Sequence, residues 1–156
     1  MYAVGGGGSV WHYNGSEWVR LPFPTDRRLH TVTCAADGYV YITDIQGSLW
    51  KGRNSKWQQI LRRGQSLPFV DSAWFNGTLW CANDYGMYVL EGSELIACHQ
   101  SKIHRVPDAV ALVSHRIDVS PDGKRMLVCG IHGAAMHDGT QWDMLFTAED
   151  FLDKDQ

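Results

Sequence analysis

Seven histidines are the first residues of this chain that could do chemistry, because a neutral imidazole binds metals and transfers protons near pH 7. The closest pairs are His99 with His104 and His132 with His137. Zinc needs three or four nitrogen, sulfur or carboxylate ligands at defined spacing, and neither pair has such a set beside it. The sequence therefore predicts no metal site and no cofactor.

The sequence also lacks the common motifs of phosphate-binding and hydrolytic enzymes. Gly5-Gly6-Gly7-Gly8 is glycine-rich, but it lacks the Lys-Ser/Thr pair and the following helix of a phosphate-binding loop. The sequence has no G-x-S-x-G elbow, and the repeat described below would not bring a serine, a histidine and an aspartate together. We therefore expect a binding protein and not an enzyme.

Basic side chains are the second kind of candidate, since arginine is favoured at protein interfaces. They gather in three segments, which are Arg27-Arg28, Arg62-Arg63 and Lys102-Ile103-His104-Arg105. The whole chain has 14 basic and 17 acidic residues and a formal charge of -3, which argues against a nucleic acid or an anionic membrane as partner. The segments suit an acidic or mixed-charge protein surface, and the alternative is that they are solvated linkers.

A repeat determines how these segments are positioned. Four similar segments begin at glycines that are 39, 39 and 47 residues apart: Gly8-Ser9-Val10-Trp11, Gly47-Ser48-Leu49-Trp50, Gly86-Met87-Tyr88-Val89 and Gly133-Ala134-Ala135-Met136. Before the last three of these lie the dipeptides Asp37-Gly38, Asn76-Gly77 and Asp122-Gly123. Such dipeptides predict type I′ hairpins, in which both central residues have positive φ.

Each repeat therefore reads as a four-stranded antiparallel meander, the unit of a propeller blade. We place the blades at about residues 2–21, 30–61, 69–98 and 115–146, with the first strand of the first blade missing. These blades make up a repeat domain of residues 1–146, and residues 147–156 form an acidic C-terminal tail. The predicted fold is all-β and β-propeller-like, and a β-sandwich of short strands is the alternative.

Tryptophans recur at equivalent positions of the repeats, and we expect them to pack between blades, with a sugar-stacking platform as the alternative. They are Trp11, Trp18, Trp50, Trp57, Trp80 and Trp142.

The incomplete first blade bears on assembly. About four blades fit either a small four-bladed ring or half of a larger ring that is completed by dimerisation. Open blade edges associate readily, so the sequence favours a homodimer or a piece of a longer protein.

The loops divide into a stereotyped set and a variable set. Turns between the first and second and between the third and fourth strands are short, whereas the opposite face carries the remaining turns and the links between blades. Variable loops on one face are where repeat folds usually place recognition. The partner-binding residues that we predict are Arg27, Arg28, Asp44, Arg62, Arg63, Asp84, Tyr85, Lys102, His104, Arg105 and His132.

Cysteine usage indicates the compartment. No C-x-x-C pair occurs, and the first residues are unlike a secretory signal, so we expect a reduced, cytoplasmic protein, with disulfides as the alternative. No apolar run approaches the ~18 residues that a membrane helix needs. Asn14-Gly-Ser16 and Asn76-Gly-Thr78 match the glycosylation pattern, but hairpin turns already explain them.

Two segments resemble bacterial propeller repeats grouped with the WD40, YVTN and BNR-like families. They are Val10-Trp11-His12-Tyr13-Asn14-Gly15-Ser16-Glu17-Trp18 and Ala36-Asp37-Gly38-Tyr39-Val40-Tyr41. The Gly-His and Trp-Asp dipeptides of WD40 repeats are missing, and Asp138-Gly-Thr-Gln-Trp142 is one residue short of a sialidase-type Asp box.

Small bacterial proteins with such repeats are similar to immunity proteins of polymorphic toxins, including toxins delivered by type VI secretion. The resemblance implies a non-catalytic protein that neutralises one cognate toxin by direct binding. Two alternatives stay open, an assembly or scaffold factor of propeller type and a carbohydrate-binding BNR-like propeller.

Overall fold

The structure is a computed structural model that describes residues 1–62, 67–107 and 114–154. Its strands form four antiparallel sheets, and each sheet is a meander in which every strand pairs with the next one along the chain. The predicted all-β fold of four-stranded sheets, with a first sheet that is one strand short, is confirmed.

The four sheets are called blades 1 to 4. Blade 1 contains β1 (Tyr2–Val4), β2 (Val10–Tyr13) and β3 (Trp18–Leu21), with a short 3-10 turn η1 (Gly6–Gly8) between β1 and β2. Blade 2 contains β4 (Leu29–Cys34), β5 (Val40–Asp44), β6 (Leu49–Arg53) and β7 (Lys56–Leu61). Blade 3 contains β8 (Asp71–Phe75), β9 (Thr78–Asn83), β10 (Gly86–Glu91) and β11 (Glu94–Ala97). Blade 4 contains β12 (Ser114–Val119), β13 (Met126–Gly130), β14 (Gly133–His137) and β15 (Trp142–Thr147), and the 3-10 helix η2 (Ala148–Lys154) follows it.

The hairpin turns are only partly of the predicted type. Asn76 and Gly77 have φ values of 50° and 81°, as a type I′ turn requires. In the other two turns only the glycine is left-handed, with φ of 85° at Gly38 and 70° at Gly123. Those connections are longer, and a longer loop closes around a type I turn followed by one left-handed residue. The type I′ prediction is therefore wrong at Asp37-Gly38 and Asp122-Gly123.

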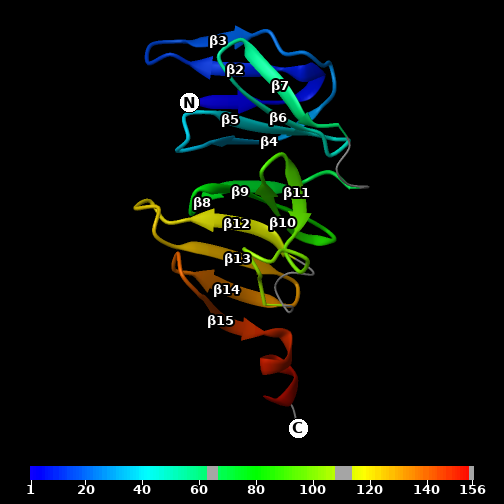
Figure 1. Cartoon of the computed structure of the whole chain (residues 1–156), viewed down its shortest axis with the longest axis vertical. Helices are drawn as coiled ribbons and strands as arrows, with labels where there is room; N and C mark the ends of the chain where they lie inside the picture. Colours follow the sequence, from blue (N-terminus) through cyan, green and yellow to red (C-terminus); the bar gives the residue numbers. More distant parts are fainter. Residues whose placement is uncertain (63–66, 108–113, 155–156) are drawn as a thin grey trace.

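The blades stack in chain order along the longest axis of the molecule (Figure 1). The first strands of blades 2, 3 and 4 lie side by side, since β4 contacts β8 and β8 contacts β12; blade 1, which lacks this strand, contacts β4 through β1. Blade 1 lies at one end of the stack, and β15 with η2 lies at the other (Figure 1). The described residues therefore form an open arc of blades, and the arc does not close into a ring within one chain.

The core consists of three apolar clusters, one at each junction between blades. Strands β5 and β9 are buried on both faces, as middle strands of stacked sheets should be. The cluster between blades 3 and 4 is built from Phe75, Trp80, Ala82, Met87, Val89, Cys98, Val106, Ile117, Met126, Val128 and Ala135. Because Cys98 and Val106 belong to the link between β11 and β12, this link also packs inside the junction.

Candidate protein-binding surface

Asp44, the last residue of β5, carries a fully buried carboxylate. Its Oδ1 accepts hydrogen bonds from the backbone N–H groups of Gln46 (2.9 Å) and Ser48 (3.0 Å). Its Oδ2 lies 3.4 Å from Nη1 of Arg27. A buried charge needs such partners because it has lost its water. Asp44 therefore shapes the β5–β6 turn and holds Arg27, so a contribution of Asp44 to partner binding would pass through Arg27.

The link that carries Arg27 and Arg28 is hydrogen-bonded to two turns. The carbonyl of Arg27 accepts from the N–H of Gly8 (2.9 Å), and the carbonyl of Arg28 accepts from the N–H of Ile45 (2.9 Å). Gly8 has a φ of 62°, and a Cβ atom there would collide with the carbonyl oxygen of Thr25. Only glycine fits this close approach, so the glycine-rich segment is what allows the link to pack against blade 1.

Two hollows adjoin this link. The larger, of about 780 Å³, is lined by residues 7–8 and 20–26. The smaller, of about 330 Å³, is lined by Arg27, Gln46, Gln59 and Arg62. We call Arg27, Arg28 and Arg62 the basic rim; Arg28 and Arg62 are exposed, and the side chain of Arg27 is 39% exposed. A planar guanidinium held by a buried carboxylate is suited to bind a carboxylate of a partner.

The corresponding turn of blade 3 repeats part of this design. Asn83 is buried at the end of β9, and its Oδ1 accepts from the N–H of Tyr85 (2.8 Å). The side chain of Tyr85 is 57% exposed. Asp84 is also exposed, and its Oδ1 lies 2.7 Å from Nε2 of His115. Asp84 and Tyr85 therefore remain accessible, although His115 already contacts the carboxylate of Asp84.

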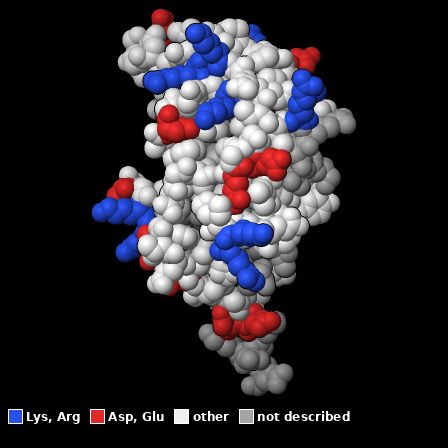
Figure 2. Space-filling model, in the orientation of Figure 1, with Lys and Arg blue, Asp and Glu red and all other residues white. Residues whose placement is uncertain are grey.

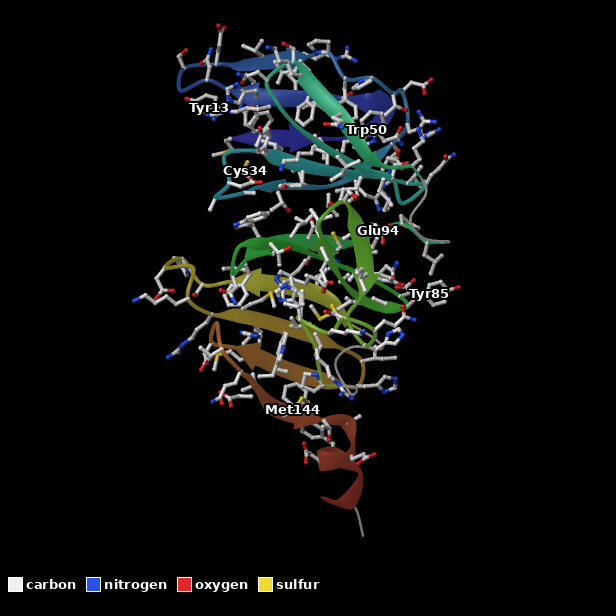
Figure 3. The ribbon with its side chains drawn as sticks, in the orientation of Figure 1. Tyr13, Cys34, Trp50, Tyr85, Glu94 and Met144 are labelled. Carbon is white, nitrogen blue, oxygen red and sulfur yellow. The ribbon has the colours of Figure 1, made fainter. Side chains whose placement is uncertain are left out.

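Labelled side chains show the division of the loops into two sets (Figure 3). Tyr13 ends β2 and Cys34 ends β4, and both lie at the left edge of the view, whereas Tyr85 lies at the right edge of blade 3. The stereotyped turns and a variable turn thus lie on opposite sides of the stack.

The link after β11 leaves the variable side. Lys102 is exposed, but the ring of His104 packs edge-on against Trp80, with ring centroids 5.4 Å apart. Arg105 lines a hollow of about 340 Å³ together with Trp142. Trp142 directly follows the β14–β15 turn, which belongs to the stereotyped set. His104 therefore lies beside Trp80 of blade 3 and Arg105 beside Trp142 of blade 4, and neither joins the basic rim.

The remaining predicted residues lie elsewhere. His132 is exposed in the β13–β14 turn, where its carbonyl accepts from the N–H of Ala148 (2.9 Å). Arg63 lies outside the described residues. The structure thus brings together Arg27, Asp44 and Arg62, with Arg28 adjacent in the chain.

Gln46 and Gln59 are the members of this surface that the sequence prediction missed. Both line the smaller hollow between the two arginines. Gln59 lies on β7, and no local pattern shows that its side chain meets a turn from another hairpin. Only the position of Gln46 in a variable turn could have indicated it.

Charged groups form separate patches on the face shown in Figure 2, with wide uncharged areas between them. A red patch lies near the lower end of the molecule, and η2 begins there with Glu149 and Asp150. Charge is therefore a local property of this surface, as the small net charge of -3 implies.

The described residues contain no cluster of three or more histidines, cysteines or acidic residues that could hold a metal ion. The four cysteines are free: Cys34 is exposed, Cys129 is half-buried, and Cys81 and Cys98 are buried. Burial raises the pKa of the Cys81 and Cys98 thiols, which keeps them protonated. Within the described ranges no helix is long and apolar enough to cross a membrane.

The sequence is similar to one curated protein of bacterial origin. Over 95 residues, or 61% of the chain, it is 36% identical to the immune protein Tsi7 of Pseudomonas aeruginosa. The match covers 31% of that relative, so the chain spans about a third of its length. No protein-family model matches the chain.

Two solved structures of β-propeller proteins have a similar fold. Virginiamycin B lyase from Staphylococcus aureus aligns with a TM-score of 0.58 at 11% identity, over 91% of this chain and 53% of the lyase chain. YCF48 bound to a D1 peptide aligns with a TM-score of 0.56 at 17% identity, over 91% of this chain and 50% of the YCF48 chain. At these identities the likeness shows the fold alone, and the chain is a β-propeller-like protein that spans about half of each of these structures.

Proposed function

We propose that this chain is an immunity protein, which binds a cognate bacterial toxin directly and has no catalytic activity of its own. The observation that carries the proposal is the 36% identity to the immune protein Tsi7 over 95 residues. A toxin of the kind delivered by type VI secretion is the partner class that we infer. Direct binding is enough for neutralisation, because a bound protein blocks the access of a substrate to the toxin.

The basic rim is the surface that we assign to the toxin. Arg27 is held in place by Asp44 before any partner arrives, so little conformational entropy is lost when it binds. The hollow beside it offers two glutamine side chains as further hydrogen-bonding groups. This chemistry fits carboxylates on the surface of the toxin, a complementarity that favours both fast association and a specific partner.

The test is a binding measurement with the toxin that is encoded beside this chain's gene. We choose the double variant Arg28→Glu/Arg62→Glu, because both side chains are exposed and neither contacts Asp44. The toxin affinity should fall by at least about tenfold, because each introduced glutamate would repel the toxin carboxylate that the arginine attracts. Circular dichroism should show an unchanged fold.

A matched control carries the same change of charge on the opposite side of the molecule. Lys124→Glu/Arg125→Glu alters two exposed residues in the β12–β13 turn, which belongs to the stereotyped set. This variant should keep the wild-type affinity. If both double variants bind equally well, the basic rim is not the toxin site; if wild-type protein binds no toxin and gives host cells no protection, the immunity function is wrong.

An assembly or scaffold role is the second candidate, since one propeller of similar fold is bound to a peptide. Purification of the chain from its native host separates the two roles. A single stoichiometric toxin supports immunity, whereas a multi-subunit membrane complex supports scaffolding. Binding on a glycan array would favour the carbohydrate-binding alternative instead.

A further inference from the structure

Two of the three junctions between blades share an aromatic contact, and the middle junction has an apolar equivalent. In each blade we call the face toward the preceding blade the N-side face and the face toward the following blade the C-side face. Tyr2 on the C-side face of blade 1 meets Trp57 of blade 2, with ring centroids 6.4 Å apart. Trp80 on the C-side face of blade 3 meets Trp142 of blade 4 in the same edge-on manner at 6.2 Å. At the middle junction, Tyr41 and Leu95 belong to one apolar cluster.

The strand registers show that these residues are equivalent. Each residue lies three positions before the one that opens the turn after its strand. Tyr2 precedes Gly5 in this way, Tyr41 precedes Asp44, and Trp80 precedes Asn83. The same count from Gly130 in blade 4 leads to Leu127 on β13. Strand alternation agrees, because Met126 and Val128 face the core toward blade 3, so Leu127 points to the opposite, C-side face.

The other half of the contact has an equivalent in blade 1. Trp57 pairs with Gly52, Leu95 with Leu90 and Trp142 with His137. Each of these partners lies one residue after the third-strand residue that pairs with the C-side residue of its own blade. Gly52 follows Lys51, which pairs with Tyr41. Leu90 follows Val89, the partner of Trp80, and His137 follows Met136, the partner of Leu127. In blade 1, Tyr2 pairs with His12, and the next residue, Tyr13, pairs with Trp18. Trp18 is therefore the equivalent of Trp57, Leu95 and Trp142. Trp18 therefore lies on the N-side face of blade 1, where the described chain has no preceding blade.

A second aromatic residue of blade 1 follows the same rule. Trp11 occupies the position of Trp50 in blade 2 and of Tyr88 in blade 3. Trp50 and Tyr88 are only 7% and 6% exposed, because the preceding blade covers them. Trp11 is 40% exposed, so the N-side face of blade 1 carries core-type side chains at its surface.

Both end faces of the arc are thus uncovered halves of one type of junction. Trp18 is 46% exposed and Leu127 is 41% exposed, whereas Tyr41 and Trp80 are 3% and 1% exposed at the position equivalent to Leu127. Repeat proteins that end in solvent usually have a polar outer face on their terminal repeats. This chain instead presents apolar side chains at both ends.

We propose that a second copy of this chain covers both end faces, so that Leu127 of each copy packs against Trp18 of the other. The two contacts are identical, and they close two open arcs into one ring with four blades from each chain. The size agrees, because one chain spans 53% and 50% of the two solved propeller chains that it resembles. The pairing does not depend on toxin binding, and the two are tested separately.

Mass in solution is the first test. By light scattering, the chain should have twice its own mass of 17.6 kDa at micromolar concentration. Trp18→Glu and Leu127→Arg should each reduce the mass to that of one chain, because each variant places a charge in both junctions. Both residues are exposed in the single chain, so the fold should survive the changes.

Matched controls place the same charges on exposed apolar residues away from the end faces. Ile45→Glu lies in the β5–β6 turn, and Ile103→Arg lies in the link after β11, with wild-type exposures of 44% and 74%. Both control variants should keep the mass of two chains.

A mixing experiment tests which faces meet. In a pair made of one Trp18→Glu chain and one Leu127→Arg chain, the first junction is wild-type, and the second brings the introduced carboxylate against the introduced guanidinium. The mixture of these two monomeric variants should therefore regain the mass of two chains, which neither variant reaches alone. Pairing of like end faces cannot produce this rescue.

Several outcomes would overturn the proposal. A wild-type chain that stays monomeric leaves the end faces to another occupant, such as further blades of a longer protein. Assemblies that grow with concentration beyond two chains show a junction that does not close. A pair that survives both charge variants, or a mixture that is not rescued, shows that other surfaces are used.

Discussion

Asp44 illustrates how one residue can serve both the fold and the proposed site. Its two oxygen atoms have different roles, since Oδ1 accepts from two backbone N–H groups of the turn while Oδ2 faces Arg27. Asn83 holds the equivalent place in blade 3 and makes the same kind of turn bond through its own Oδ1. The turn therefore needs one acceptor oxygen at this position, and the second oxygen of Asp44 serves Arg27 and the indole N–H of Trp50 (3.5 Å).

This division predicts unequal effects of two substitutions. Asp44→Ala removes the acceptor of two backbone N–H groups and of the Trp50 indole N–H, and it should lower the free energy of unfolding by about 2 to 4 kcal/mol. Asp44→Asn keeps an acceptor for the turn but replaces Oδ2, which accepts from Trp50 Nε1 (3.5 Å) and pairs with the half-exposed Arg27, so it should cost less, about 1 to 2 kcal/mol. Urea denaturation measures both values.

Asp84→Ala is the matched control, because the carboxylate of Asp84 is 60% exposed and its contact is with a half-exposed histidine. Its effect should stay below about 1 kcal/mol. Equal losses for Asp44→Ala and Asp84→Ala would contradict the role that we assign to the buried carboxylate.

The sequence predicted part of the candidate surface at the residue scale. Arg27 and Arg62 were recognisable because both belong to links that follow a fourth strand. Arg105 also follows a fourth strand, yet it lies beside Trp142. The difference arises because Cys98 and Val106 are buried between blades 3 and 4, and this burial depends on distant side chains that a local pattern does not report.

At the scale of elements, the strands were predictable and the turn types only partly so. Apolar runs between glycine-containing turns specify a meander, because alternate residues must reach the junctions on either side. Asp37-Gly38 resembles Asn76-Gly77 in sequence, but the length of the loop decides whether the first residue becomes left-handed. Loop length depends on where pairing ends, which tertiary packing sets.

The junction between blades 3 and 4 should respond to acid. His137 packs edge-on against Trp142 at 4.8 Å and against Phe75 at 5.4 Å. Burial lowers the pKa of its imidazole from the ordinary value of 6.5; nearby His104 acts in the same direction, and Asp138 acts against it. The folded chain therefore binds a proton on His137 only at a pH where the unfolded chain already carries one.

The neutral His137 side chain should make its full contribution to the free energy of unfolding above pH 6.5. This contribution should be lost as the pH falls through the lowered pKa of His137 in the folded state. His137→Gln should flatten the decrease in thermal stability over that interval, while the exposed His132→Gln should keep the wild-type slope. Differential scanning fluorimetry between pH 7.5 and about 5 measures the slopes. Parallel slopes for wild type and His137→Gln would contradict this account.

At the scale of the whole molecule, an open arc connects stability to concentration. Only folded chains present both end faces, so pairing stabilises the folded state by mass action. The Tm of the wild-type chain should rise on the order of 2 °C for each tenfold increase in concentration. Trp18→Glu should have a Tm that does not change with concentration, and a concentration-independent Tm of the wild type would argue against pairing.

The four thiols of this chain differ in exposure, so their reaction rates can report on the assembly of the chain. Cys81 and Cys98 are buried and stay protonated, so an alkylating reagent such as a maleimide should react first with the exposed Cys34. Cys129 lies two residues after Leu127 on the same face of β13. The rate at which Cys129 is alkylated should therefore report the fraction of C-side end faces that are uncovered. It would follow the opening and closing of the ring without any added probe.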